Sequence, residues 1–373
     1  MLQEPSGVWI MAYTTIDDPS AHFQPVLWSG SGSGQAITNG GNSDLQPDFV
    51  WIKNRDAADS HCLFDSTRGA TEVLHCDATT AETTDADTLD SFASDGFQVD
   101  ADVKVNTNTE KYVAWQWKAN AGSTSSNTSG AITSTVQANT AAGFSVVKYT
   151  GPNDGSDSAN NGGAYWSIGH GLGATPEVII LKGYDSTHNW YYWHKEMGAE
   201  TSGYYQRFNS DLAVTSQANI LWGNTAFSST LFEVGGWDVV NRDPQNYIAY
   251  MWTPIQGYSK FGIYKGNGAA DGTFVYTGFK PAWLLIKEST SGNTNDLFIY
   301  DIERSAANPM DDLLITSGNG AETTGRADID FLSNGFKCRA THADTNRDAG
   351  TFVYLAFAHQ PFVTSGGVPC TAR

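Results

Sequence analysis

The chain is poor in basic residues and in long apolar runs. Lys and Arg total 21 of 373 residues against 40 Asp and Glu, which gives a formal net charge of −19 at pH 7. So acidic a chain repels phosphate backbones and anionic lipids, and its basic residues are scattered singly. We therefore expect no nucleic-acid binding and no membrane insertion. No stretch approaches the roughly 18–20 consecutive apolar residues of a transmembrane helix.

Cysteines and charged residues are also scarce. The four cysteines show no CxxC spacing, so the sequence predicts neither a zinc site nor a disulfide framework. Charged residues make up only 16% of the chain, too few for the outer faces of long helices. The 38 glycines and the 12% of aromatic residues instead favour short strands joined by turns, and hence an all-β fold. The N-terminus has no basic segment ahead of an apolar core, which predicts synthesis in the cytoplasm without a secretory signal.

One pattern of three landmarks recurs three times in the same order. The first is a proline followed by an apolar block that ends in lysine, as expected for a strand covered on both faces. The second is an Asp-Gly, Gly-Gly or Asn-Gly pair flanked by aromatic residues, which predicts a type I′ hairpin turn. The third is an alternating strand with its large residues on one face. The landmarks lie at residues 47–53, 92–97 and 112–117, then 176–182, 232–237 and 247–252, and finally 281–287, 331–336 and 352–357.

The repeat predicts three tandem β-sandwich modules. We expect a short N-terminal arm over residues 1–22, followed by modules over 23–119, 144–255 and 256–373. Each module is long enough for the seven or eight strands of a sandwich. Residues 120–143 contain ten Ser or Thr and no charged residue, which predicts an extended linker between the first two modules.

No catalytic motif stands out. The chain has no HExxH, P-loop or GxSxG sequence, and nothing brings a particular pair of carboxylates together. We therefore expect a protein that is not an enzyme and has no cofactor. Asp65 and Arg68 are interpreted as stabilising a turn, with a catalytic or ligand loop as the alternative.

Two patterns could bind a metal, but each has a simpler interpretation. The pairs His61-Cys62 and His75-Cys76 suit a soft metal, yet they occur in one module only, so we interpret them as core residues. Asp344, Asn346 and Asp348 have the alternating oxygens of a calcium loop. The following glycine comes one place too late and no glutamate ligand follows, which favours a solvated hairpin loop.

The second module departs from the repeat in a segment dense in aromatic residues. Strand alternation places Trp190 and Tyr192 on one face and Tyr191 and Trp193 on the other. Since one face should be core, we expect the other to expose aromatic rings. Such a face would form a subunit interface or, as the less favoured alternative, a glycan site. The candidate binding residues are Tyr184, His188, Trp190, Tyr191, Tyr192, Trp193, Tyr204 and Tyr205.

Four segments together resemble a repeat module of virion structural proteins of marine bacteriophages, which are often labelled tail fibre or tail-appendage proteins. These segments are residues 47–55, 63–71, 94–97 and 112–118. The likeness is close in the first module and looser in the other two, and the second module has residues 194–198 in place of the Asp65–Gly69 segment. The resemblance implies architecture and a location in the virion, and it transfers no catalytic residues.

From the resemblance we expect a tail fibre or receptor-binding tail appendage. Its partners would be other virion proteins, such as a tail adaptor, a nozzle or the capsid, and a host-surface glycan or protein. Mutual burial of edge strands in a β-rich spike predicts a homotrimer. A capsid-surface decoration or head-fibre protein is the alternative. A polysaccharide depolymerase is the enzyme class that would need a carboxylate pair in an aromatic groove.

Overall fold

The computed structural model describes residues 2–3, 9–10, 12–152, 165–217, 220–290, 292 and 295–370. Nearly all of its regular structure is antiparallel β-sheet, which confirms the all-β expectation. The helices are single turns: α1 (Val103–Asn106), α2 (Asp238–Asn241), α3 (Ala343–Asn346) and the 3-10 turns Pro19–Ala21, Lys195–Met197 and Glu200–Ser202. Among these residues no helix is long and apolar enough to cross a membrane.

The first large sheet has the strand order β3-β11-β5-β6-β7-β8, and a small sheet, β4-β10-β9, packs on one of its faces. A separate hairpin of β1 (Leu2–Gln3) and β2 (Trp9–Ile10) precedes them. The strands are β3 (Phe23–Ser29), β4 (Gln35–Ile37), β5 (Phe49–Asn54), β6 (Cys62–Asp65), β7 (Gly69–Leu74), β8 (Thr83–Thr84), β9 (Leu89–Ala93), β10 (Gly96–Val99) and β11 (Lys111–Trp117).

The second large sheet has the order β12-β13-β14-β21-β16-β17-β18-β19, and its small sheet is the pair β15-β20. The strands are β12 (Ser125–Asn127), β13 (Ser134–Asn139), β14 (Phe144–Thr150), β15 (Trp166–Gly169), β16 (Val178–Gly183), β17 (Tyr191–His194), β18 (Tyr204–Arg207), β19 (Thr215–Ser216), β20 (Leu231–Val234) and β21 (Asn246–Trp252).

The third large sheet has the order β22-β29-β24-β25-β26, and its small sheet is β23-β28-β27. The strands are β22 (Ser259–Lys265), β23 (Phe274–Tyr276), β24 (Phe279–Glu288), β25 (Leu297–Asp301), β26 (Leu314–Ile315), β27 (Ile329–Leu332), β28 (Gly335–Cys338) and β29 (Thr351–Pro361).

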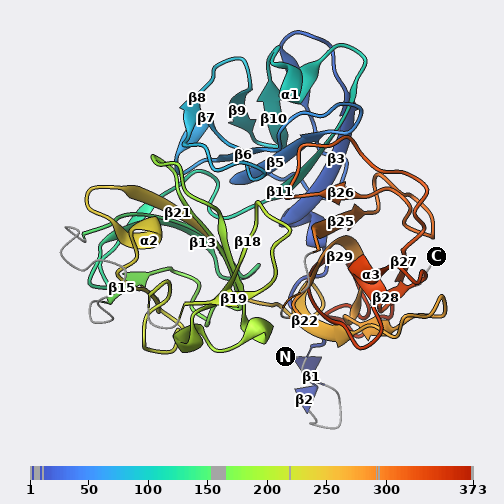
Figure 1. Cartoon of the computed structure of the whole chain (residues 1–373). Coiled ribbons are helices and arrows are strands. Elements are labelled where there is room, and N and C mark those ends of the chain that lie inside the picture. Colours follow the sequence, from blue (N-terminus) through green and yellow to red (C-terminus); the bar gives the residue numbers. More distant parts are fainter. Residues whose placement is uncertain are drawn as a thin grey trace.

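The three large sheets are arranged around a shared interior (Figure 1), and buried side chains of all three, many of them aromatic, form one core there. Trp117 of β11 shows this directly, because its ring centre lies 6.0 Å from that of Trp252 in the second sheet and 5.6 Å from that of Trp283 in the third. The opposite face of each large sheet packs on its own small sheet in a separate outer core. Both faces are therefore buried, which explains why β5 and β16 are apolar without alternation.

Residues 120–143 do not form the expected linker. β12 and β13 lie within them, and β13 pairs antiparallel with β14 from Thr135 opposite Lys148 to Asn139 opposite Phe144. The segment is thus part of the second large sheet. The expectation was wrong because a Ser/Thr-rich edge strand, polar on its solvent side, has the same composition as an extended linker.

A hairpin forms in two of the three places, but the predicted type I′ turn was wrong. The turn residues are 94–95 and 333–334, and none of them has the positive φ that this turn type requires. β9–β10 and β27–β28 are hairpins, whereas the Gly235-Gly236 pair leads from β20 directly into α2. In the two hairpins the glycine is required because a backbone oxygen passes too close to it for a side chain. A Cβ atom would lie 2.0 Å from Ile37 O at Gly96 and 2.0 Å from Val275 O at Gly335.

Candidate functional site

The aromatic segment of the second sheet is buried on both faces. Trp190 and Tyr192 lie in the shared core, and Tyr191 and Trp193 lie in the outer core of the second sheet. The Trp190 indole donates to the carbonyl oxygen of His75 at 2.9 Å, so it joins the second sheet to the first. The expected exposed aromatic face was wrong, because the large sheet is covered by the other two sheets on one face and by its own outer layer on the other.

The remaining candidates are dispersed. Tyr205 is buried, Tyr184 and His188 are half-buried, and Tyr204 is exposed. The Tyr184 carbonyl accepts the Glu82 amide at 2.6 Å, another contact between the first two sheets. Burial raises the pKa of Tyr184 to about 12 and lowers that of His188. These residues do not form one accessible binding surface.

The candidate metal ligands already have other partners. The Trp51 indole donates to His61 Nδ1 at 2.9 Å, and His61 Nε2 lies 2.9 Å from Ile315 O, so both ring nitrogens are used. Asn346 donates to the carbonyl oxygens of Ala269 and Ala340, while Asp344 pairs with Arg326. Among the residues that the structure describes, no group of three or more His, Cys, Asp or Glu side chains could hold a metal ion.

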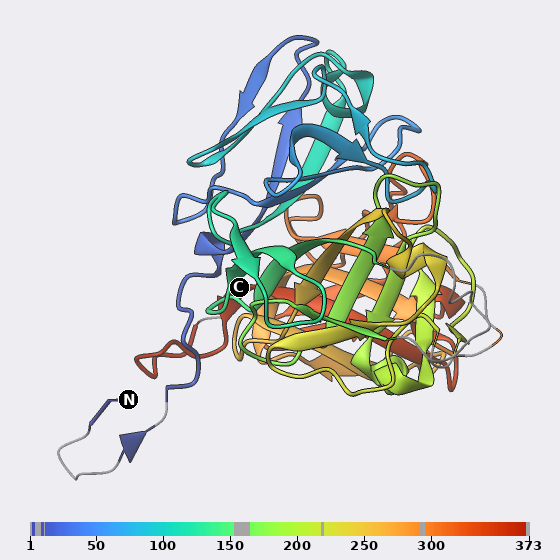
Figure 2. The ribbon, with the colours of Figure 1, turned by 90° about the vertical axis from the view of Figure 1, so that its left-hand side faces the viewer.

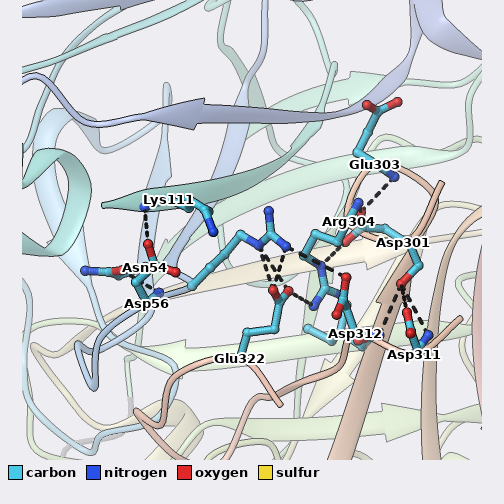
Figure 3. A network of polar contacts seen from close by, with 12 residues as sticks. Asn54, Asp56, Lys111, Asp301, Glu303, Arg304, Asp311, Asp312 and Glu322 are labelled. Carbon is cyan, nitrogen blue, oxygen red and sulfur yellow. Dashed lines mark hydrogen bonds and ion pairs between the residues drawn. The ribbon is translucent and has the colours of Figure 1, made fainter. Parts of the chain in front are cut away.

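A buried charged network joins the third sheet to the first (Figure 3). Arg304 pairs with Asp301 at the end of β25 and with Glu322 at 3.0 Å. Glu322 also accepts from Arg55, which follows β5, at 2.8 Å. Burial opposes the charge on Arg304, but Asp301 and Glu322 outweigh it and raise the pKa of the guanidinium. The network is therefore a fixed structural contact.

The same arrangement joins the first sheet to the second. Asp65 accepts the backbone N–H of Arg68 at 2.9 Å and pairs with its side chain, and Arg68 also pairs with Glu82. Asp65 in addition accepts from the Tyr250 hydroxyl of β21 at 2.7 Å. The segment that carries much of the phage resemblance thus forms a turn, as interpreted from the sequence, and also a contact between sheets.

The lysines that end the three apolar blocks are fully buried as well. Lys182 donates to the carbonyl oxygens of Thr79, Ser186 and His188 at 2.6–3.1 Å, and burial lowers its pKa to about 7. Lys53 and Lys287 also bind backbone carbonyls, and burial lowers the pKa of each to about 8. The recurrence of lysine at this place was the sequence signal for this role, which the sequence interpretation missed.

The accessible candidate site lies elsewhere, along β22 and β23, and we call it the open edge. Ile263, Phe274 and Tyr276 are 42%, 45% and 47% exposed there. Lys260 donates to the Tyr276 carbonyl at 2.7 Å, and its ammonium lies 5.3 Å from the centre of the Tyr276 ring. The Tyr13 hydroxyl, 3.1 Å from that of Tyr276, brings the N-terminal segment to the same place.

A groove of about 430 Å³ lies beside the open edge, lined in part by Tyr13, Lys195, Gln256, Lys260 and Tyr276. It offers aromatic faces, an amide and the Lys260 ammonium, whereas the Lys195 ammonium pairs with Glu177 of the same groove at 2.6 Å. This lining suits a polar partner. The sequence signal was the alternation of Phe274 and Tyr276 about Val275, which the landmark pattern does not include.

Comparison with known proteins places the chain in a family without showing its activity. No curated protein and no solved structure matches it. The family model described as a domain of unknown function, DUF7483, matches residues 18–361, which include all three large sheets and their small sheets. The chain therefore belongs to the DUF7483 family.

Proposed function

We propose that the protein is a non-catalytic structural protein of a bacteriophage virion, most directly a receptor-binding tail appendage. The virion assignment comes from the sequence resemblance. The observation that carries the binding role is the contrast between the enclosed charged groups and the accessible open edge. A protein of this kind acts through a surface and not through a reaction.

The hydrogen-bond partners of the buried charged side chains support a role without catalysis. Asp301, Arg304 and Glu322 are occupied between two sheets, and Asp65 and Arg68 are occupied in the same way. Catalytic acids and bases need access to a substrate. Groups whose hydrogen bonds are all directed into the protein lack that access.

The arrangement of the ends supports attachment to another virion protein. The β1–β2 hairpin projects away from the body, on the side where the C-terminal segment also leaves it (Figure 2). The arm would contact the tail adaptor or nozzle, and the body would carry the surface for a host glycan or protein. In this role we propose that three copies associate as a homotrimer.

Capsid-surface decoration is the second candidate, and the shared core favours it. A chain whose three large sheets surround one core is a compact body, unlike the string of separate modules expected of a fibre shaft. A compact body suits repeated placement on a shell lattice. The same modules would then stabilise the capsid.

The copy number per virion tests both candidates. We would measure it by quantitative mass spectrometry of purified particles against the major capsid protein. Tens of copies, in multiples of three or six, would support the trimeric appendage. Hundreds would contradict the tail assignment and support decoration, and absence from purified particles would contradict the virion assignment.

A further inference from the structure

The open edge has equivalents in the other two large sheets. β22 pairs with β29 as β14 pairs with β21 and as β3 pairs with β11. Each of these first strands has one side that faces away from its partner. Because the three sheets repeat one pattern, the segment that covers this side of one sheet indicates the kind of segment that would fit the same side of another.

In the second sheet a segment of the chain itself covers the edge. β13 pairs with β14, and just before it the amide of Ile132 donates to Ser167 O of β15 at 3.0 Å. The side chains of Ile132 and Val136 are 7% and 3% exposed, so both aliphatic groups are buried in this position. One extended segment therefore covers the edge strands of the large and the small sheet together.

In the first sheet the equivalent strand carries a proline. The Gly30 amide donates to Glu110 O of the facing segment, and antiparallel alternation then directs the nitrogen of Pro25 away from β11. A proline there has no N–H to offer an added strand, which is a common protection of sheet edges.

In the third sheet neither a covering strand nor a proline protects the corresponding edge. Among the described residues β29 is the one strand paired with β22, and no proline lies in β22. The Gly266 amide donates to Gly350 O, so alternation directs the N–H and C=O of Ile263 outward. Ile263 is the counterpart of Lys148, which lies opposite Thr135 of β13 in the second sheet, and with no such strand beside it the Ile263 side chain is 42% exposed.

We propose that the open edge binds an extended, acidic segment of a different virion protein, which adds as an antiparallel strand to β22. Because the partner is a virion protein, this inference rests on the proposed function. Charge favours an acidic segment, since Lys260 and Lys265 flank the exposed Ile263. Main-chain hydrogen bonds would provide affinity, and the exposed apolar side chains would provide specificity.

The second sheet also supplies the probe. Fluorescein-labelled peptides with the sequence of residues 132–139 would be titrated with the full chain and followed by fluorescence anisotropy. If the peptide adopts the register of β13 on β14, position 138 lies opposite Lys260, because Ala138 lies opposite Ser145 and Ser145 is the counterpart of Lys260. We expect the A138E peptide to bind about threefold more tightly than the native peptide, a cross-strand charge effect, and Lys260→Glu to reverse that order.

Two variants at one position separate strand addition from apolar contact. Ile263→Pro removes the outward N–H but leaves the bonds to β29, and we expect at least a tenfold loss of peptide affinity. Ile263→Ser keeps the N–H and removes the apolar side chain, so it should lose only a fewfold. Circular dichroism and the urea midpoint would show that both variants remain folded.

Three results would overturn the inference. They are no peptide binding by the wild-type chain, binding that Ile263→Pro leaves unchanged, and self-association of the chain that Ile263→Pro abolishes, which would make a second copy the occupant. All of these use the isolated protein. The copy number in particles is measured separately, so failure of the inference and failure of the proposed function are distinguishable.

Discussion

The indole Nε1 of Trp115, on β11 of the first sheet, donates to Oδ2 of Asp301, at the end of β25 of the third sheet, at 2.9 Å. The equivalent contact between the second and first sheets runs from the Tyr250 hydroxyl to Asp65 at 2.7 Å. In both places one carboxylate accepts a backbone N–H of its own turn, pairs with the arginine of that turn and accepts a hydrogen bond from the neighbouring sheet. The second sheet has His194 in the corresponding segment, and its Nε2 lies 3.2 Å from Tyr354 O of the third.

Replacement of Asp301 by asparagine should destabilise the whole chain. The change removes one of the two carboxylates that pair with the buried Arg304. Loss of the sole partner of a buried charge typically costs about 3–5 kcal/mol, so with Glu322 still in place we expect a smaller loss, of about 2 kcal/mol. Urea unfolding would measure this loss. Asp271→Asn is the control, because Asp271 pairs with Lys337 at the surface, and it should leave the urea midpoint unchanged. Equal midpoints for the two variants would contradict a structural role for the network.

Alanine at Gly96 or Gly335 should be destabilising for a steric reason. The added Cβ would lie 2.0 Å from a backbone oxygen, which neither strand can avoid without moving. We expect a loss of about 2 kcal/mol or more in the free energy of unfolding. Gly320→Ala is the matched control, since nothing lies within 4 Å of its Cβ position. Thermal melting of the three variants would check this, and a tolerated G96A would be evidence against the close approach.

Acid should destabilise the protein through its buried histidines. Burial lowers the pKa of His61 and His194 to about 3, whereas an unfolded histidine titrates near 6.5. Between these values the unfolded chain binds more protons, so stability is complete above pH 6.5 and falls as the pH falls toward 3. Each histidine contributes up to about 1.4 kcal/mol per pH unit in this window.

The measurement is the urea midpoint between pH 4.5 and 7 for the wild type and for His61→Gln. The variant should show a smaller dependence on pH, whatever its stability at pH 7. An unchanged slope would mean that His61 titrates normally in the folded protein, against its burial.

Trp190 should behave as a core residue and not as a binding residue. Trp190→Ala should cost about 3–5 kcal/mol, the usual range for a buried tryptophan. Tyr204→Ala, at an exposed neighbour on the next strand, should change stability by less than about 1 kcal/mol. Thermal unfolding compares the two. A stable W190A protein that failed to adsorb to host cells would restore the glycan-site interpretation of this segment.

The strands of the repeat were predictable because local pattern determines them. The apolar blocks at β5 and β16 and the alternating strand β11 have the expected residues, and the double burial of the blocks was visible in their lack of alternation. What covers the second face of each large sheet could not be predicted, because the sequence does not say whether the same chain or another chain covers it. In the structure the other two sheets of the same chain supply it.

The candidate site was harder to predict for the same reason. Trp190 and Tyr192 have the composition of a binding face, and only their packing against the first sheet shows that they are core. Ile263 has no unusual sequence context. Its exposure follows from the absence of a covering strand that the second sheet has in β13, and this difference appears only when the three sheets are compared.

The central claim is that the three large sheets share one core and form a single structural unit. Equilibrium urea unfolding of the full chain, followed by tryptophan fluorescence and by far-ultraviolet circular dichroism, tests it directly. We predict one transition with the same midpoint by both probes. Separate transitions, or a fragment of residues 23–119 that folds alone with the same stability, would contradict the claim.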